Sequence, residues 1–166
     1  LRTMAAVITA VVMCGRTGAA FAAELATMQA NEEVDALSVL GLNAVDYLVL
    51  PRVLTLLFMM PLLYLFGCVG GLLGGFAVSS SLLDLAPIAY FDRTVAALTY
   101  THLGLGFFKS MAFGLLVSLA ACFHGLYAPR NAAGVGMATT RAVVAGIVGV
   151  IALDAVFAVC ADALGI

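Results

Sequence analysis

Long stretches of apolar residues dominate this chain and restrict what it can fold into. Three complete stretches span residues 53–78, 103–128 and 142–161, and a fourth covers residues 1–14. Each complete stretch can cross a hydrocarbon layer of about 30 Å as a helix that rises about 1.5 Å per residue. Lipid offers no hydrogen-bond partner to the backbone, so runs of this length must be helical. The sequence therefore predicts an all-α, polytopic membrane helical bundle with four spans.

The composition agrees with a protein that lies in a bilayer. Hydrophobic residues make up 64% of the 166 residues and charged residues only 10%, whereas soluble domains average about 45–50% and about 25%. Such a chain has too little polar surface to cover a water-soluble globule. The net charge of -2, from 7 basic and 9 acidic residues, provides no basic field for nucleic acid. Because Leu1 already lies within an apolar run, we expect the true N-terminus to lie upstream.

Residues with catalytic or metal-binding chemistry are few. The four cysteines form no CxxC pair, so we expect neither a disulfide framework nor a zinc site. His102 and His124 are 22 residues apart, near opposite ends of one stretch, and cannot share a metal ion. No phosphate-binding loop of the Walker type occurs. We therefore expect a chain that is not an enzyme, holds no cofactor or metal, and leaves any use of ATP to another subunit.

Basic residues near the ends of the spans indicate the orientation of the chain. If residues 15–52 are cytoplasmic, four arginines lie on the inner side and one lies outside. The inner four are Arg16, Arg52, Arg130 and Arg141, and the outer one is Arg93. Cytoplasmic flanks of membrane spans carry an excess of Lys and Arg. We therefore expect a cytoplasmic segment at 15–52 and a periplasmic segment at 79–102.

The cytoplasmic segment contains a predicted amphipathic helix at residues 32–40. Asn31 is a candidate N-cap, and Gly41 is placed to end the helix. One face carries Val34, Leu37 and Leu40, and the other carries Glu32, Glu33 and Asp35. Such a helix suits docking by a soluble partner while its apolar face rests on the bundle. A solvated helix without a partner explains the same periodicity equally well.

The periplasmic segment contains a second predicted helix, which begins near Pro87 and lies at the membrane interface. Its apolar residues recur every three or four positions, at Ile88, Phe91, Val95 and Leu98. Tyr90 and Tyr100 suit the level of the lipid headgroups.

Paired glycines in the second span indicate a helix-packing surface. Gly70 and Gly74 are four residues apart, as are Gly71 and Gly75. Small residues at this spacing let membrane helices approach closely. The alternative is that glycine is simply commoner in membrane helices than in soluble ones.

Three charged residues, Arg2, Lys109 and Asp154, fall inside apolar runs. Counted from the cytoplasmic ends of their spans, they lie roughly 20, 26 and 20 Å deep at about 1.5 Å per residue. They therefore share one layer beyond the midplane of the bilayer. Ionised groups at this depth normally face the bundle interior and pair with one another. We expect a Lys109–Asp154 pair with Arg2 nearby, although Arg2 and Lys109 could each extend to an interface instead.

Several motifs follow one another in an order typical of one family. They are GRTGAAFAAELATMQANEEVDALSVLG from Gly15, DYLVLPRVLTLLFMMPLL from Asp46, GGLLGG from Gly70, FKSMAFGLLVSLAACFHG from Phe108, ATTRAVV from Ala138 and ALD from Ala152. Over nearly its whole length the chain resembles the MlaE/YrbE family of ABC transporter permeases. It departs from the family at Thr3, where the family usually has a glutamate, and it lacks the family's N-terminal interfacial helix and first span.

The resemblance implies a permease subunit of an ATP-driven lipid transporter in a bacterial inner membrane. In that family two permease copies pair, cytosolic ABC ATPase subunits dock below them, and MCE-domain proteins form a lipid-conducting ring outside. By the motif match, four acids fall in the region that contacts the ATPase: Glu24, Glu32, Glu33 and Asp35. The family's FKS-like and LD-like motifs also carry charges at Lys109 and Asp154. The expected substrate is a phospholipid or a similar lipid.

Two other functions are compatible with a polytopic membrane chain. A secondary transporter or channel without an ATPase would need conducting polar residues in several spans and would not need a docking helix. A structural membrane scaffold would purify without bound lipid. Recovery of an ATPase with the purified protein would separate the first function from a secondary transporter or channel.

Overall fold

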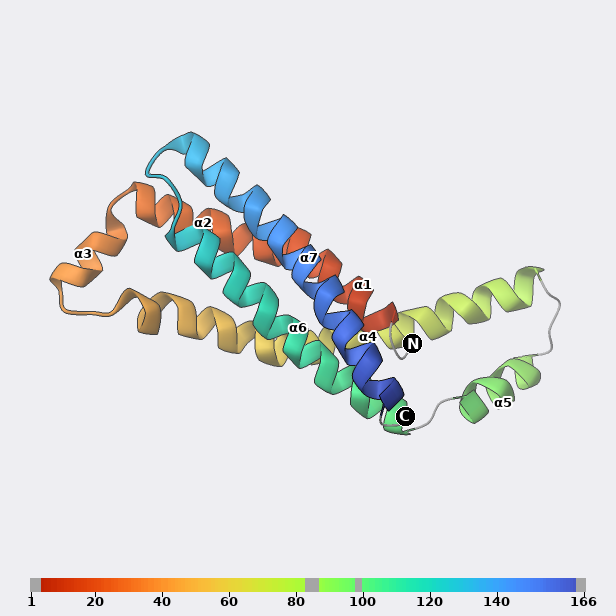
Figure 1. Ribbon diagram of the computed structural model, residues 1–166. Coiled ribbons are helices and arrows are strands. Elements are labelled where there is room, and N and C mark those ends of the chain that lie inside the picture. The colour runs from red at the N-terminus through yellow and green to blue at the C-terminus, as the bar shows by residue number, and fades with distance from the viewer. Residues whose placement is uncertain (1–3, 83–86, 98–99, 164–166) are drawn as a thin grey trace.

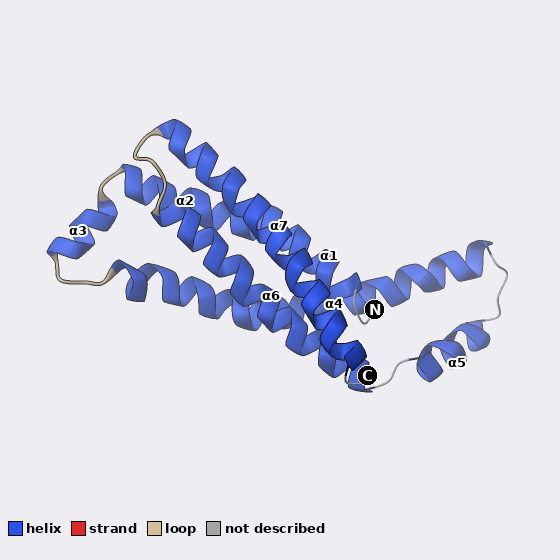
Figure 2. Ribbon diagram, in the orientation of Figure 1, coloured by secondary structure: helices blue, strands red, loops and turns tan. Residues whose placement is uncertain are grey.

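Helices make up the whole of the described structure apart from short connections. The computed structural model describes residues 4–82, 87–97 and 100–163. Along the chain these residues form α1 (Met4–Met13), the π-helical segment η1 (Cys14–Gly18), α2 (Ala19–Ala30), α3 (Glu33–Val39), the π-helical segment η2 (Val45–Val49), α4 (Leu50–Leu82), α5 (Pro87–Ala97), α6 (Tyr100–Leu126) and α7 (Ala132–Ala163). Figure 2 shows that the described residues contain no strand.

Four helical stretches are long and apolar enough to cross a membrane: Met4–Ala30, Val45–Ser81, Leu103–Leu126 and Ala132–Ala163. The predicted all-α polytopic bundle is therefore confirmed. Large apolar side chains cover its outer surface, and Phe58, Phe66 and Val148 are each more than 60% exposed. An apolar surface of this extent is unsuited to water and suited to lipid or partner helices.

Two helices extend beyond the apolar runs that predict them. The first continues past Cys14, because η1 carries the helical path through residues 14–18 into α2. There Ala22, Leu25 and Ala26 are buried, so tertiary packing stabilises the extension. The last helix begins at Ala132 and not near Ala142. Gly134 and Ala138 are buried in this added part, which is therefore also stabilised by packing.

Helix α6 lies at the centre of the bundle, in contact with α1, α2, α4 and α7 (Figure 1). In its most apolar stretch 50% of the residues are buried, compared with 11% in α7. The main core cluster joins four helices and contains Ala6, Ala10, Cys14, Leu56, Met60, Tyr64, Cys68, Phe113, Val117 and Val150. The bundle is therefore organised around the helix that carries Lys109.

Small residues set the distance between neighbouring helices. On α7 the buried positions Gly134, Ala138, Ala142 and Gly146 recur every fourth residue. A Cβ atom added at Gly146 would lie 3.0 Å from the Cys14 sulfur, which shows how closely α7 approaches the first helix. A Cβ atom at Gly114 of α6 would lie 2.9 Å from the Leu56 carbonyl oxygen on α4. These contacts follow the small-residue pattern of membrane helix packing.

The paired glycines predicted to form a packing surface in the second span are not at the close contacts just described. No atom lies within 4 Å of a Cβ built at Gly70 or at Gly74, whereas one built at Gly75 would meet the Tyr90 hydroxyl at 2.9 Å. Gly71 borders a groove between α1 and α4 that also contains Thr9. Within the described residues, Gly70 and Gly74 thus form an open surface, and their role as a helix-packing surface stays a prediction.

Helix α5 begins at Pro87, where the sequence places the start of an interfacial helix. The C-terminal part of α4 extends beyond the bundle, and α5 folds back along it (Figure 1). The Tyr90 hydroxyl donates a 2.8 Å hydrogen bond to the Leu72 carbonyl, and the Phe76 ring packs on the rings of Tyr90 and Phe91. Leu98 lies outside the described residues, and the side chain of Tyr100 is not among those described.

Gly114 and Gly104 of α6 provide a matched test of the close packing between α6 and α4. We expect Gly114→Ala to destabilise the detergent-solubilised protein by about 1–3 kcal/mol, because the new methyl group meets backbone that cannot move aside. Gly104→Ala should have little effect, since nothing lies within 4 Å of its Cβ position. Thermal unfolding of the two variants measures the difference. Equal melting temperatures would show that the helices do not approach at Gly114.

Candidate functional site

An ion pair crosses the bundle between its two most C-terminal helices. Lys109 of α6 and Asp154 of α7 pair through Nζ and Oδ1. The Lys109 side chain is 1% exposed and that of Asp154 is 27% exposed. The Phe113 ring lies beside the ammonium, with its centroid 5.7 Å from Nζ. Arg2, the third residue of the expected charge cluster, lies outside the described residues.

The surroundings of Lys109 explain why it needs this partner. A buried ammonium loses its hydration, and the loss is offset only when an opposite charge lies close to it. The neighbouring Ser110 hydroxyl donates instead to the Phe107 carbonyl of its own helix. The Asp154 carboxylate is therefore the acidic partner of the lysine within the described residues, and the pair joins α6 to α7 deep in the bundle.

At one end of the molecule, the short helix α3 connects α2 to α4 (Figure 1). The prediction that Asn31 caps this helix is wrong. Asn31 ends α2, where its N–H donates to the Thr27 carbonyl at 3.0 Å. The residue before α3 is Glu32, whose left-handed φ of 61° turns the chain between the two helices. Gly41, with φ of 76°, ends α3 as predicted.

The apolar face of α3 is held by two side chains. Val34 and Leu37 pack against a cluster of four buried residues: Leu25, Leu48, Val49 and Cys122. Leu40, expected on the same face, is 73% exposed. It lies one residue beyond the end of the helix, so the helical periodicity no longer directs its side chain toward the bundle.

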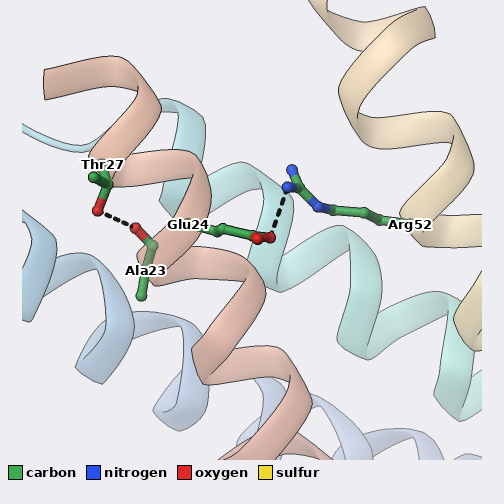
Figure 3. A network of polar contacts seen from close by, with 4 residues as sticks. All are labelled: Ala23, Glu24, Thr27 and Arg52. Carbon is green, nitrogen blue, oxygen red and sulfur yellow. Dashed lines mark hydrogen bonds and ion pairs between the residues drawn. The ribbon is translucent and has the colours of Figure 1, made fainter. Parts of the chain in front are cut away.

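The four acids expected to contact an ATPase divide into two groups. Glu24 forms a 2.8 Å ion pair with Arg52 of α4 (Figure 3), and the Arg52 guanidinium also lies over the Phe21 ring. Asp35 forms a 2.7 Å ion pair with Arg130, in the connection between α6 and α7. Glu24 and Asp35 thus hold parts of this chain together.

The second group, Glu32 and Glu33, is exposed to solvent. Glu33 accepts a 3.3 Å hydrogen bond from the Asn31 amide. Among the described residues, neither glutamate forms an ion pair. Two adjacent negative charges are therefore exposed at the N-terminal end of α3.

Sequence reasoning did not identify Arg52 and Arg130 as partners of these acids. Their positions 28 and 95 residues away from Glu24 and Asp35 carry no local signal. In the sequence, both arginines indicate only the orientation of the chain. Their placement at the α3 end could have suggested pairing, because acids and arginines gather on the same side of the predicted membrane.

Two grooves follow the seam between α6 and α7, and no sequence pattern predicted them. One, of about 410 Å³, is lined by His124, Thr140, Arg141, Val144, Ala145 and Val148. The other, of about 540 Å³, has an entirely apolar lining that includes Leu116, Ala145 and Leu153. Both contain Ala145, so they adjoin. Within the described residues, no group of three or more His, Cys, Asp or Glu side chains is placed to hold a metal ion.

The Lys109–Asp154 pair can be tested with a cycle of Lys109→Met, Asp154→Leu and the double variant. We expect each single variant to lose about 3–5 kcal/mol of stability, because it leaves an unpaired charge in an apolar environment. The double variant should be more stable than either single one. Thermal unfolding and membrane yield provide the measurements, and single defects that simply add would show that the residues do not interact.

Comparison with known proteins identifies the family. Residues 1–160 match the family described as Permease MlaE. A probable ABC transporter permease protein of Rickettsia conorii is 40% identical over 143 residues, which cover 86% of this chain and 55% of the relative. One of Synechocystis is 38% identical over 149 residues, 90% of this chain and 57% of the relative.

A plant protein is also similar. The chloroplastic protein TRIGALACTOSYLDIACYLGLYCEROL 1 of Arabidopsis thaliana is 37% identical over 153 residues, which cover 92% of this chain and 44% of the relative. The chain thus spans about half the length of the curated relatives it matches. The family match over residues 1–160 and the four long apolar helices together show that this multi-pass membrane chain belongs to the MlaE family of ABC transporter permeases.

Proposed function

We propose that this chain is the membrane-spanning, non-catalytic subunit of an ATP-driven transporter that moves phospholipid or a similar lipid. The observation that carries the proposal is the geometry of α3, with Val34 and Leu37 packed on the bundle and Glu32 and Glu33 projecting from its end. This arrangement suits contact with a separate ATPase subunit, which the family of ABC permeases implies. The work of this chain is then conformational: nucleotide binding moves the docked ATPase, and α3 transmits the movement to the bundle.

Three features support a lipid as the substrate. Most of the buried residues in the described part of the bundle are apolar, and the buried polar ones there are Ser79, Lys109, Ser110 and Ser118, so its interior suits a lipid better than a hydrophilic solute. The deepest charges, Lys109 and Asp154, neutralise each other. The name of the plant relative contains a galactolipid. In this proposal the Lys109–Asp154 pair pins two spans together and forms the polar floor or gate of the lipid cavity.

The proposal includes further partners and a location. A second copy of this chain would complete a homodimer, for which the open surface at Gly70 and Gly74 is available. An MCE-domain protein would sit on the opposite end from α3, above α5. The complex would lie in a bacterial inner membrane, with the α3 end of the bundle cytoplasmic and the α5 end periplasmic. Because the first membrane helix extends from Met4 to Ala30, the cytoplasmic segment would begin later than the predicted residue 15. The excess of arginines at the α3 end supports this orientation.

Charge reversal on α3 tests the ATPase contact. We expect Glu32→Lys combined with Glu33→Lys to lower recovery of the ATPase with the full-length permease by about tenfold, because like charges across an interface repel. Asp92→Lys, an exposed position on α5 at the other end, is the control and should leave recovery unchanged. Quantitative pull-down in mild detergent provides the measurement.

Two outcomes would contradict the proposal. Unchanged recovery of the ATPase after the double reversal would show that α3 is not the contact. Absence of any ATPase from the wild-type complex would favour a secondary transporter or channel that works without one.

Cysteine labelling tests the orientation. In a variant without the native cysteines, Ser38→Cys on α3 should react with a membrane-impermeant maleimide only after the cytoplasmic side is opened. Asp92→Cys on α5 should react in intact spheroplasts. Both positions are exposed, so access depends on the side of the membrane and not on burial. The reverse pattern would invert the proposed topology.

A further inference from the structure

The grooves between α6 and α7 open onto the surface of the bundle and carry polar groups at one end only. His124, Thr140 and Arg141 line the end near α3, and the lining from Val144 onward is apolar. The adjoining groove continues along Ala145 and Gly149 to Leu153 without a polar side chain. Along α7, the two grooves together therefore extend from the cation of Arg141 to an apolar end at Leu153.

Arg141 forms no ion pair within the described part of the chain. The ion pairs there join Arg52, Lys109 and Arg130 to acids. Its side chain is exposed at the edge of the groove. The Thr140 hydroxyl already donates to the Gly136 carbonyl, so Arg141 is the strongest free donor at this end. Guanidinium groups bind phosphate oxygens with two parallel hydrogen bonds.

The length of the groove matches one leaflet of a bilayer. Leu153 lies 12 positions after Arg141, a distance of about 18 Å along a helix. One leaflet contributes about 15 Å of hydrocarbon, half of the total thickness. A lipid whose phosphate lies at Arg141 therefore has its acyl chain alongside Val144, Val148 and Leu153, and the chain ends near the midplane.

We propose that the α6–α7 groove is a binding site for a bilayer phospholipid, with the lipid phosphate on Arg141 and one acyl chain in the trough. The assignment rests on the proposed function for the orientation that places Arg141 in the cytoplasmic leaflet. The bound lipid is anionic by preference, since the headgroups of zwitterionic lipids bring a second charge that opposes the arginine. The site opens sideways to the membrane, so lipid enters it from the leaflet without crossing water.

Photo-crosslinking in nanodiscs tests the site. The full-length protein is reconstituted with phosphatidylglycerol or phosphatidylcholine that carries a diazirine in one acyl chain, and labelled peptides are mapped by mass spectrometry. We expect labelling to concentrate at residues 144–153 and to favour phosphatidylglycerol by about fivefold, the effect of one cation at an anionic headgroup. Arg141→Gln should remove this preference.

Matched variants separate the site from general lipid contact. Ala145→Phe fills the point where the two grooves meet and should abolish the concentrated labelling, whereas Val156→Phe, at an exposed position of α7 outside the groove, should not. Arg93→Gln removes a cation from α5 and should leave the lipid preference unchanged. Labelling that is spread over all exposed helices, or unchanged by Arg141→Gln and Ala145→Phe, would overturn the proposal.

The competing occupant is a membrane helix of another protein or of a second copy. Benzoylphenylalanine at Val148 distinguishes it, because crosslinks to protein in place of lipid would reject the lipid site. The same preparation is assayed for the ATPase. A complex that retains the ATPase but shows no groove labelling rejects the groove alone, and a complex without ATPase but with labelling rejects the proposed function alone.

Discussion

The close approach of helices to α6 is the constraint on which the rest of this structure depends. In lipid, burying apolar side chains between helices gains little, because lipid tails are equally apolar. Van der Waals packing must therefore hold the bundle, and it falls off steeply when atoms separate. Glycine at positions 114 and 125 lets α4 and α2 reach the backbone of α6, where an added Cβ at Gly125 would lie 2.7 Å from the Leu25 Cβ. Helix α6 also packs directly on α7, and there Asp154 reaches Lys109.

Much of the architecture could be predicted from the sequence, because the bilayer reduces the possible structures to a few. Apolar runs of this length must be helical, so the four long helices could be predicted from the lengths of the apolar runs. The ends of short helices were predictable where a single residue imposes its conformation. Pro87 begins α5, as its fixed φ and missing N–H favour in a first turn. Gly41 ends α3 in the left-handed region that other residues avoid.

The predictions that failed have a common cause. Where the local sequence favours two structures equally, tertiary contacts decide between them. Small residues stand four apart on α4 and on α7, and only the fold shows that the stripe from Gly134 to Gly146 is buried while Gly70 and Gly74 are open. Asn31 is an equally good residue for ending a helix and for capping the next. The partners of Glu24 and Asp35 are set by how distant helices meet. The pairing of Lys109 with Asp154 is seen in the fold, whereas their shared depth in a membrane stays a prediction.

The attachment of α3 is weak compared with the packing of the bundle, and this difference bears on its proposed role. The Asp35–Arg130 pair is about half exposed at both residues, and exposed ion pairs contribute only about 0–1 kcal/mol. Val34 and Leu37 are partly buried, and α3 itself contains no buried residue. Segments with few buried contacts open at low free energy. By contrast, Lys109 is enclosed, and a shift of α6 against α7 would strain its pairing with Asp154. In the proposed function, a docked ATPase would therefore move α3 more easily than the bundle, and the Asp35–Arg130 pair would link that movement to the α6–α7 connection.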